Sequence, residues 1–210
     1  MTPSSIDAET VRALIEINTL INSEYYDVNA LLVRILESAM RLVACESSSI
    51  LLKNKADNLL HFEVALGPKG AEAKSIPVSK GSIAGWVYDH RESLVINDVA
   101  QDPRFFSMVQ QKTGYATHNM IAVPLLVKST CIGVIELLNK DSDFTPRDLA
   151  TLESLGTQAS IAYQNAQAFR NARNEIAALQ NTIEQGSAFH SFLANSKAVL
   201  DLVNVVNQVA

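Results

Sequence analysis

The sequence is poor in cysteine and has no long apolar run. Cys45 and Cys131 are its two cysteines, and neither belongs to a CxxC motif or a Cys/His cluster. The chain therefore encodes neither a disulfide framework nor a structural zinc site, and both residues are expected to be reduced thiols in the core. No window approaches the roughly 18 apolar residues of a membrane helix, and the first residues lack the parts of a signal peptide. We therefore expect no membrane partner and a cytoplasmic location.

Runs of basic residues are also missing. The 210 residues contain 17 Lys and Arg against 22 Asp and Glu, which gives a formal net charge of -5. Without a basic patch, this segment is not expected to bind nucleic acid or anionic lipid by itself. Hydrophobic residues make up 48% of the chain, enough for one core of about 150 residues. The expected partners are small molecules and proteins.

Apolar residues recur at helical spacing near both ends of the chain. The pattern predicts amphipathic helices over Asp7–Asn22 and Val28–Val43. A long helix is predicted to begin at Thr145-Pro146, with Thr as cap and Pro at the first position, and to end near Gly186. A last short helix is predicted from Ser196. The long helix carries residues at alternating steps of three and four, the spacing of a coiled-coil seam: Leu152, Leu155, Ala159, Ala162, Ala166, Phe169, Arg173, Ile176, Gln180 and Ile183.

Between these helices the apolar period changes to two, which is typical of strands. Strands are predicted over residues 48–52, 59–66, 75–78 and 94–96. One face of the second strand is expected to carry Leu60, Phe62, Val64 and Leu66. Ser82 and Asp102 are predicted to cap two short helices, the second of which ends at Gly114.

Two further alternating runs, Met120–Val127 and Cys131–Leu138, flank the polar link Lys128-Ser129-Thr130 and predict a hairpin. Pro124 indicates an edge or bulged position in the first of these strands, because proline cannot donate to the ladder. The order of helices and strands indicates an α+β fold in which helices flank a mostly antiparallel sheet.

Glu136 interrupts the apolar run of the second hairpin strand. A buried carboxylate costs several kcal/mol unless it is neutralised or paired. It therefore needs a hydrogen-bond donor from a ligand or an internal Arg or Lys, unless the strand lies at an edge. Thr113 and Thr117 can donate and accept at a phosphate or a purine edge, and they can equally serve in caps and loops. Phe62 and Trp86 are core residues or stacking platforms for a ring.

Polar residues gather in the loops before the hairpin. Asp98, Asp102 and Asn119 can line a pocket, or they can close turns and cap helices. Arg104 can bind an anion or form a salt bridge within its loop.

Six short motifs, in order, resemble those of a GAF domain over about residues 28 to 170. They are GSIAGW (81–86), LVIND (94–98), DPRF (102–105), TGYATHN (113–119), VPL (123–125) and IGVIELLNK (132–140). GAF domains are sensory modules. The resemblance implies a central antiparallel sheet, helices on one face that dimerise, and a ligand pocket over the other face.

The resemblance is closest to the cyclic-nucleotide-binding branch, whose motif is Asn-Lys, a variable gap, Phe, three residues and Asp-Glu. Asn139, Lys140, Phe144 and Asp148 match this motif, and Leu149 stands where it has Glu. The resemblance implies that the four matching residues form a structural latch, with an ion pair between Lys and Asp.

The same resemblance places the ligand contacts. Thr113, Thr117 and Glu136 fall at positions that contact the nucleotide, and Ile83 and Ala84 offer backbone groups at the pocket wall. The expected ligand is a cyclic nucleotide or another small molecule, and no cofactor or metal is otherwise expected.

The tail has a resemblance of its own. Residues 192–210 resemble the opening of the ATPase domain in sigma-54 enhancer-binding activators, with Ala194 and Lys197 where that family usually has Gly and Pro. The expected division is an N-terminal dimerisation helix (1–27), a GAF sensory domain (28–170), a helical linker (171–190) and the truncated start of an ATPase-like domain (191–210).

We therefore expect a non-enzymatic sensor in a bacterial transcription activator, which forms a homodimer through its terminal helices and controls an attached output domain. Two alternatives stay open. One is a GAF domain that dimerises and binds no ligand. The other is a thiol-dependent enzyme similar to free-methionine-sulfoxide reductases, although Cys45 and Cys131 lack the expected partners.

Overall fold

The computed structural model describes residues 8–23, 28–78, 80–105, 108–194 and 201. The chain divides into two compact units, Met1–Ala166 and Gln167–Ala210, of which the first contains the sheet. The predicted helix from Ser196 and most of the predicted ATPase-like segment lie outside the described residues. In the described part of the chain, no helix combines the length and the apolar character needed to cross a bilayer.

Five antiparallel strands form one sheet in the order β2-β1-β5-β4-β3. They are β1 (Cys45–Lys53), β2 (Leu60–Leu66), β3 (Leu94–Ile96), β4 (Met120–Val127) and β5 (Thr130–Lys140). The last two strands form the predicted hairpin, and β5 is the central strand. Glu136 therefore lies in the middle of the sheet and not at an edge. The predicted α+β fold class is confirmed.

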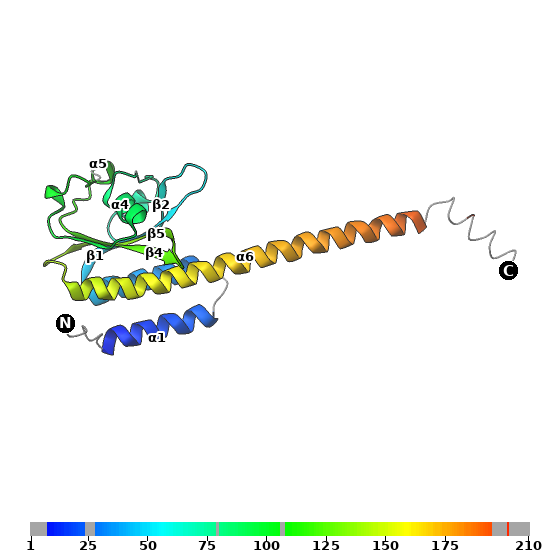
Figure 1. Cartoon of the computed structure of the whole chain (residues 1–210), viewed down its shortest axis with the longest axis horizontal. Coiled ribbons are helices and arrows are strands. Elements are labelled where there is room, and N and C mark those ends of the chain that lie inside the picture. The colour runs from blue at the N-terminus through cyan, green and yellow to red at the C-terminus, as the bar shows by residue number, and fades with distance from the viewer. Residues whose placement is uncertain (1–7, 24–27, 79, 106–107, 195–200, 202–210) are drawn as a thin grey trace. The chain divides into compact units, whose positions relative to one another are not determined.

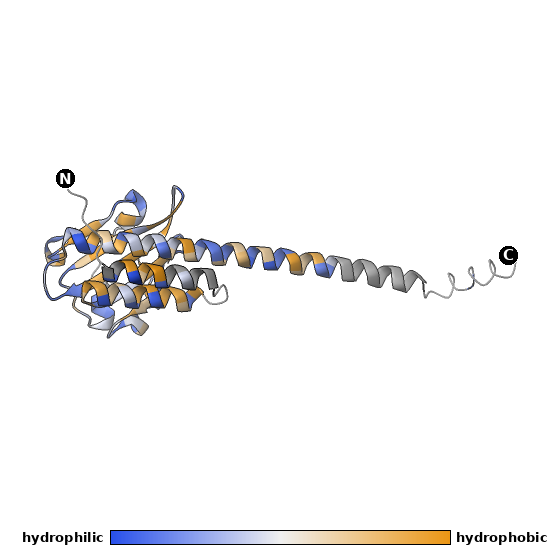
Figure 2. Cartoon of the chain, turned by 90° about the horizontal axis from the view of Figure 1, so that it is seen from below, coloured by the Kyte–Doolittle hydropathy of each residue, from blue (hydrophilic) through white to orange (hydrophobic). Residues whose placement is uncertain are grey.

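Helices cover both faces of the sheet (Figure 1). On one face lie α2 (Val28–Val43) and the first part of α6 (Pro146–Ala194), and α1 (Ala8–Ser23) packs against α2. Figure 2, which views the chain from this side, shows these three helices running alongside one another in front of the sheet. The other face carries α3 (Gly70–Ala73), α4 (Ile83–His90), the 3-10 helix η1 (Val99–Gln101) and α5 (Met108–Thr113).

Each face of the sheet has its own apolar core, because side chains alternate along a strand. Ile135 packs with Ile35 and Leu155 in the core beneath α2 and α6. Its neighbour Val134 packs with Val87 in the core beneath α4. Glu136 has the same parity as Val134 and therefore faces the α4 side.

A β-bulge at Glu63 divides the apolar residues of β2 between these cores. Ile50 pairs with Val64 and the next residue, Leu51, pairs with Phe62, so Glu63 has no partner in β1. A bulge adds one residue and reverses the alternation beyond it. The prediction that four residues of β2 share one face is therefore wrong. The α4-side core contains Leu60 and Phe62, and the core under α2 and α6 contains Val64 and Leu66.

Two predictions about short segments are also wrong. The strand predicted over 75–78 is reduced to a single bridge between Val78 and Leu60. Asp102 does not begin a helix. Its carboxylate is engaged by the side chain of Arg104, and Asp98 instead caps η1 by accepting a hydrogen bond from Ala100 N at 3.1 Å. Gly114, with a φ of 70°, follows the end of α5 as predicted.

Pro124 has the edge position that its chemistry requires. The short strand β3 pairs with β4 only over Met120–Ala122, so β4 is an edge strand where Pro124 lies. The missing N–H therefore leaves no ladder hydrogen bond unmade.

The start of α6 is the predicted capping box. Asp148 N donates to Thr145 Oγ1 at 3.3 Å, and Thr145 N donates to Asp148 Oδ2 at 2.8 Å. The predicted end near Gly186 is wrong, since α6 continues to Ala194. One glycine costs a helix only about 1 kcal/mol relative to alanine, which does not end it.

The predicted seam on α6 is used in two different ways. Its first four residues are at most 3% exposed and pack in the domain's own core, so they cannot form an interface with another chain: Leu152, Leu155, Ala159 and Ala162. In the second unit, the side chains of residues 168–182 are exposed.

Candidate ligand-binding cavity

A cavity of about 110 Å³ lies between the sheet and the helices α3, α4 and α5. One water needs roughly 10–15 Å³ by the same measure, so the cavity has room for a small organic molecule. Its wall is mostly apolar, with Leu51, Phe62 and Phe105 among the residues that line it. In the described part of the chain Lys69 is the one cationic residue in this wall, and its ammonium lies 3.0 Å from Glu72.

Glu136 lies in the sheet wall of this cavity. Its cross-strand neighbours are small, with Ser49 on β1 and Ala122 on β4, which leaves space beside the carboxylate. The residue is 6% exposed, and its Oε2 accepts a hydrogen bond from Ser49 Oγ at 2.9 Å. No ion pair among the described residues includes Glu136. The internal Arg or Lys considered from the sequence is therefore not found there.

Burial is the largest influence on the pKa of the Glu136 carboxyl. It raises the pKa of Glu136 to about 7, and the hydrogen bond from Ser49 offsets only part of the effect. A carboxylate can accept several hydrogen bonds, and a protonated carboxyl can also donate one. At neutral pH, Glu136 can therefore meet either a donor or an acceptor on a ligand.

Thr113 and Thr117 both line the cavity but differ in their hydrogen bonds. Thr113 Oγ1 donates to Val109 O at 2.7 Å and accepts from Tyr115 N at 3.2 Å, so its hydroxyl hydrogen is already used at the end of α5. The Thr117 hydroxyl makes no hydrogen bond within the described part of the chain. Of the two, Thr117 is the one free to bind a ligand.

Ile83 and Ala84 line the cavity where α4 begins. Ser82 caps this helix, and its Oγ accepts a hydrogen bond from Gly85 N at 3.0 Å. The first N–H groups of a helix have no partner within the helix and carry its partial positive charge. This end of the cavity therefore suits a hydrogen-bond acceptor or an anionic group.

Asp98 and Asn119, which the sequence also suggested as ligand contacts, do not line the cavity. Asp98 caps η1. Asn119 Nδ2 donates to Lys140 O at 2.9 Å and to Ser142 O at 3.1 Å, and its Oδ1 accepts from Lys140 N at 2.9 Å. These bonds fix the end of β5.

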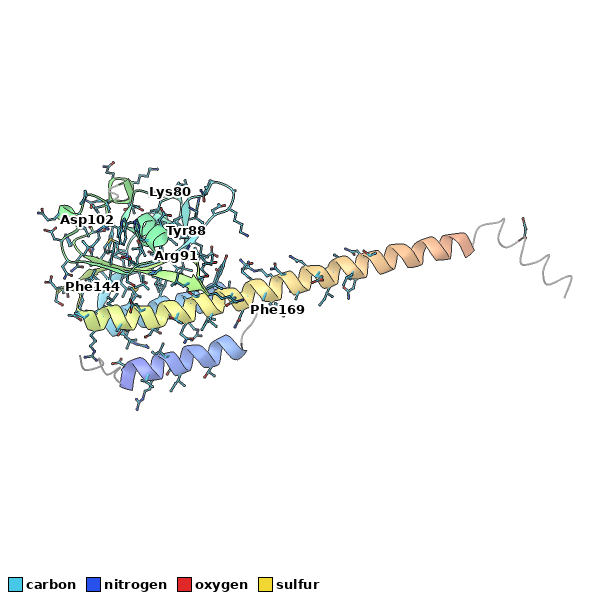
Figure 3. The ribbon with its side chains drawn as sticks, in the orientation of Figure 1. Lys80, Tyr88, Arg91, Asp102, Phe144 and Phe169 are labelled. Carbon is cyan, nitrogen blue, oxygen red and sulfur yellow. The ribbon has the colours of Figure 1, made fainter. Side chains whose placement is uncertain are left out.

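The four residues proposed as a latch lie between β5 and the start of α6. Lys140 Nζ lies 2.6 Å from Asp148 Oδ2. Burial acts to raise the pKa of Asp148, but the hydrogen bonds from Lys140 and Thr145 outweigh it and hold the pKa below its usual value. Phe144 is 3% exposed, and Asn97 bonds both its N–H and its carbonyl. Figure 3 labels Phe144 at the entry to α6.

The loop that carries Phe105 to the cavity is fastened to α4 from outside. Asp102 accepts two side-chain hydrogen bonds from Arg104, at 2.9 and 2.6 Å. The Arg104 guanidinium lies 4.8 Å from the ring centroid of Trp86, which stacks on His90 at 4.1 Å. Arg104 thus forms the salt bridge within its loop, and Trp86 is not part of the cavity wall. Figure 3 labels Asp102 on this side of the sheet.

The polar residues of the wall that sequence reasoning missed include Ser47, Ser49 and Tyr115. The available signal was the run of three serines at 47–49, which enters a strand that is otherwise apolar. Read with period two, this run places Ser47 and Ser49 on the same face as Leu51.

The two thiols show no arrangement for redox chemistry. Neither lines the cavity. Cys45 pairs in register with Lys140 at one end of β5 and Cys131 lies at the other end, which separates them by about 30 Å at roughly 3.3 Å per residue. Burial raises the pKa of Cys45 to about 12 and also raises that of Cys131, which disfavours the reactive thiolate. No group of His, Cys, Asp and Glu able to hold a metal occurs among the described residues.

The fold is an α+β domain in which helices flank an antiparallel sheet and a cavity lies on one face of that sheet. The family model for the GAF domain matches residues 26–164. The chain belongs to the GAF domain family.

Individual proteins agree with this assignment. A probable 3',5'-cyclic phosphodiesterase of Caenorhabditis elegans is 26% identical over 190 residues, which is 85% of this chain and 26% of that protein. The chain thus spans about a quarter of this relative. The GAF domain of a phosphoenolpyruvate-protein phosphotransferase from Acinetobacter has the same fold, with a TM-score of 0.66, 18% identity, and coverage of 79% of this chain and 99% of that one.

An enzyme shares the fold as well. The free methionine-R-sulfoxide reductase of Neisseria meningitidis matches with a TM-score of 0.63 and 17% identity, covering 79% of this chain and 95% of that one. At such identity the likeness concerns the fold alone.

Proposed function

We propose that this chain is a cytoplasmic, small-molecule-sensing GAF domain that regulates an attached output domain and is not itself an enzyme. The observation that carries the proposal is the environment of Glu136. A buried carboxyl lies in the wall of a largely apolar cavity, and the described protein gives it a single hydrogen bond, from Ser49. Buried polar groups are normally satisfied, so this carboxyl favours a ligand that brings its own hydrogen-bonding group.

A 3',5'-cyclic nucleotide suits the two polar ends of the cavity. The N–H groups of a purine can donate to Glu136, and the cyclic phosphate can accept from the backbone N–H groups of Ile83 and Ala84. The apolar wall, including Phe62, can cover the faces of the ring. The relationship to a probable cyclic phosphodiesterase supports this choice of ligand.

The latch gives the sensor a route to its output. Lys140 and Asp148 join the strand that carries Glu136 to the first turn of α6. A ligand shifts a conformational equilibrium only by its difference in affinity for the two states. We therefore expect ligand binding to change the arrangement of α6 at its start.

A homodimer through α1 and α6 is part of the proposal. Exposed apolar side chains occur on both helices, including Val11 and Ile15 on α1. On the second part of α6, exposed residues alternate steps of three and four: Phe169, Ala172, Ile176 and Leu179. This series, part of which Figure 3 labels at Phe169, is more apolar than the seam predicted through Arg173 and Gln180.

For the output, we propose the ATPase domain of a bacterial transcription activator. The support is the resemblance of residues 192–210 to the opening of such domains. Sequencing the gene downstream of Ala210 tests this directly. A phosphate-binding loop of the form G-x-x-x-x-G-K-[ST] shortly after Ala210 is expected, and its absence would contradict the proposed output.

Thermal unfolding of the purified chain tests the proposed ligand. The panel contains 3',5'-cyclic AMP and GMP, the corresponding 5'-nucleotides, 2-oxoacids, amino acids and divalent metals. A cognate ligand at about 100 times its Kd should stabilise the fold by about 2.7 kcal/mol. Glu136→Gln should weaken binding about tenfold, and Glu63→Gln, which changes an exposed glutamate, should not. A panel in which no compound stabilises the protein would favour the alternative of a dimerisation module without a ligand.

A further inference from the structure

Tyr115 connects the cavity to polar side chains outside it. This residue lines the cavity, and its phenol oxygen lies 2.6 Å from Ser47 Oγ and 2.7 Å from Glu46 Oε2. The phenol has one hydrogen, which it donates to the Glu46 carboxylate, so the Ser47 hydroxyl donates to the phenol oxygen. Burial raises the pKa of Tyr115 to about 12, and the phenol therefore keeps its hydrogen at neutral pH.

Glu46 carries this connection to the end of β5. Its Oε2 also accepts a hydrogen bond from Asn139 Nδ2 at 3.0 Å, and the donors Asn139 and Tyr115 together lower the pKa of Glu46. Asn139 makes two further bonds to the segment after Tyr115. Its Nδ2 donates to Ala116 O at 2.8 Å, and its Oδ1 accepts from His118 N at 2.9 Å. Glu46 and the loop of Tyr115 thus hold the side chain of Asn139.

The backbone of Asn139 depends on this support. Its φ is 57°, in the left-handed region that is unfavourable for residues with a Cβ, although Asn tolerates it better than most. This residue interrupts the regular alternation of β5 just before Lys140. Lys140 then reaches Asp148 at 2.6 Å, within the capping box of α6.

We propose that Tyr115 couples occupancy of the cavity to the start of α6 through Glu46, Asn139 and the Lys140–Asp148 ion pair. A ligand that binds the Ser47 hydroxyl or displaces the Tyr115 ring weakens the bond to Glu46 and loosens the loop around Asn139. The left-handed turn then loses support, and Lys140 is no longer held beside Asp148.

This path solves a geometric problem in the sensor. The cavity lies on the α4 face of the sheet, and α6 packs on the opposite face. Asn139 lies at the end of the central strand, where a change in one backbone torsion alters which face the next side chain reaches. Tyr115 is a positioning residue, because it acts on α6 through other residues.

Amide hydrogen exchange of the 210-residue chain without ligand tests the path by itself. Tyr115→Phe keeps the ring and removes the hydroxyl. Exchange should become roughly two- to tenfold faster, the range for losing one hydrogen bond, at the amides that close the first turn of α6: Thr145, Asp148 and Leu149. Tyr88→Phe is the matched control, because this tyrosine lies on α4 outside the path.

Asn139→Gly provides the second arm of a double-mutant cycle. Glycine adopts the left-handed conformation without side-chain support, so this change preserves the turn and interrupts the path. In the Asn139→Gly background, Tyr115→Phe should leave the three amides unchanged. Additive effects in the double variant, or unchanged exchange in Tyr115→Phe alone, would overturn the proposal.

The same exchange measurement with saturating 3',5'-cyclic GMP tests whether the ligand acts through this path, and it rests on the proposed function. Cyclic GMP should alter the exchange of these amides in the wild type and not in Tyr115→Phe. An equal change in both proteins would contradict the coupling. If cyclic GMP does not bind, the proposed ligand is wrong, and the cycle measured without ligand still decides whether the path exists.

Discussion

Ser49 Oγ donates to Glu136 Oε2 across neighbouring strands, at 2.9 Å, and this is the single hydrogen bond that the described protein gives to its buried carboxyl. The pair faces the cavity. Because a serine hydroxyl carries no charge, it stabilises the carboxylate less than an Arg or Lys would. Glu136 therefore keeps a pKa near neutrality, which has a measurable consequence for stability.

Stability should fall as the pH rises through the titration of Glu136. The pKa is about 7 in the folded chain against an ordinary value of 4.5, so the contribution is complete below pH 4.5 and lost as the pH passes 7. The loss is about 3 kcal/mol. Glu136→Gln should remove it, giving a variant that is similar to the wild type at pH 4.5 and more stable at pH 8. Denaturant unfolding at both pH values measures the difference. A Glu136→Gln variant that is no more stable at pH 8 would contradict the raised pKa, and Glu63→Gln serves as the exposed control.

Thr113 and Thr117 should separate stability from binding, although both line the cavity. Thr113→Val removes the bond to Val109 O and the acceptor of Tyr115 N, so it should lower the free energy of unfolding by about 1–2 kcal/mol. Thr117→Val should leave stability unchanged and weaken cyclic-nucleotide binding roughly fivefold. Urea unfolding and titration calorimetry measure the two effects, and equal losses of stability would refute the distinction.

Trp86 should report on the loop that covers the cavity, because it is the only tryptophan in the chain. Arg104→Ala removes the cation above its ring and releases Asp102. The Trp86 emission should shift to longer wavelength, and acrylamide should quench it more strongly. Arg104→Lys should restore the emission only in part, because lysine lacks the planar fork. Unchanged emission in Arg104→Ala would show that the stack does not hold the loop. Lys112→Ala, which changes an exposed residue of α5, is the control.

The sequence predicted those parts of the fold that depend on local chemistry. The cap at Thr145, the edge position of Pro124 and the hairpin of β4 and β5 each follow from the hydrogen-bonding capacity of residues close in the chain. The sequence also singled out Glu136, because one carboxylate interrupts an apolar strand, but it left open whether that strand lies at an edge.

Features that depend on distant partners could not be predicted in the same way. The bulge at Glu63 arises in the pairing of β1 with β2, and period two along β2 alone gives no sign of it. Spacing by three and four shows that one face of α6 is apolar, but not whether a sheet or a second helix covers it. The sheet covers Leu152 and Leu155. The hydroxyl of Tyr115 is held by hydrogen bonds with Ser47 and Glu46, which lie far from it in the chain, so its place in the cavity wall could not be predicted locally.

The ion pair of Lys140 with Asp148 should make the start of α6 sensitive to acid. Both side chains are mostly buried, at 16% and 11% exposed, so Lys140→Met should cost about 2 kcal/mol at pH 6 by leaving Asp148 without its cation. The folded pKa of Asp148 is lowered below 3.8, so this contribution is present above pH 3.8 and lost as the pH falls through the folded value. The difference between wild type and Lys140→Met should therefore shrink by pH 3. In the Asp148→Asn background, Lys140→Met should have little effect on stability, because residue 148 no longer carries a charge that needs the Lys140 cation. Denaturant unfolding at pH 6 and pH 3 is measured for the wild type, Lys140→Met, Asp148→Asn and the double variant. A difference between wild type and Lys140→Met that is as large at pH 3 as at pH 6 would assign the loss of stability to packing of the Lys140 side chain instead.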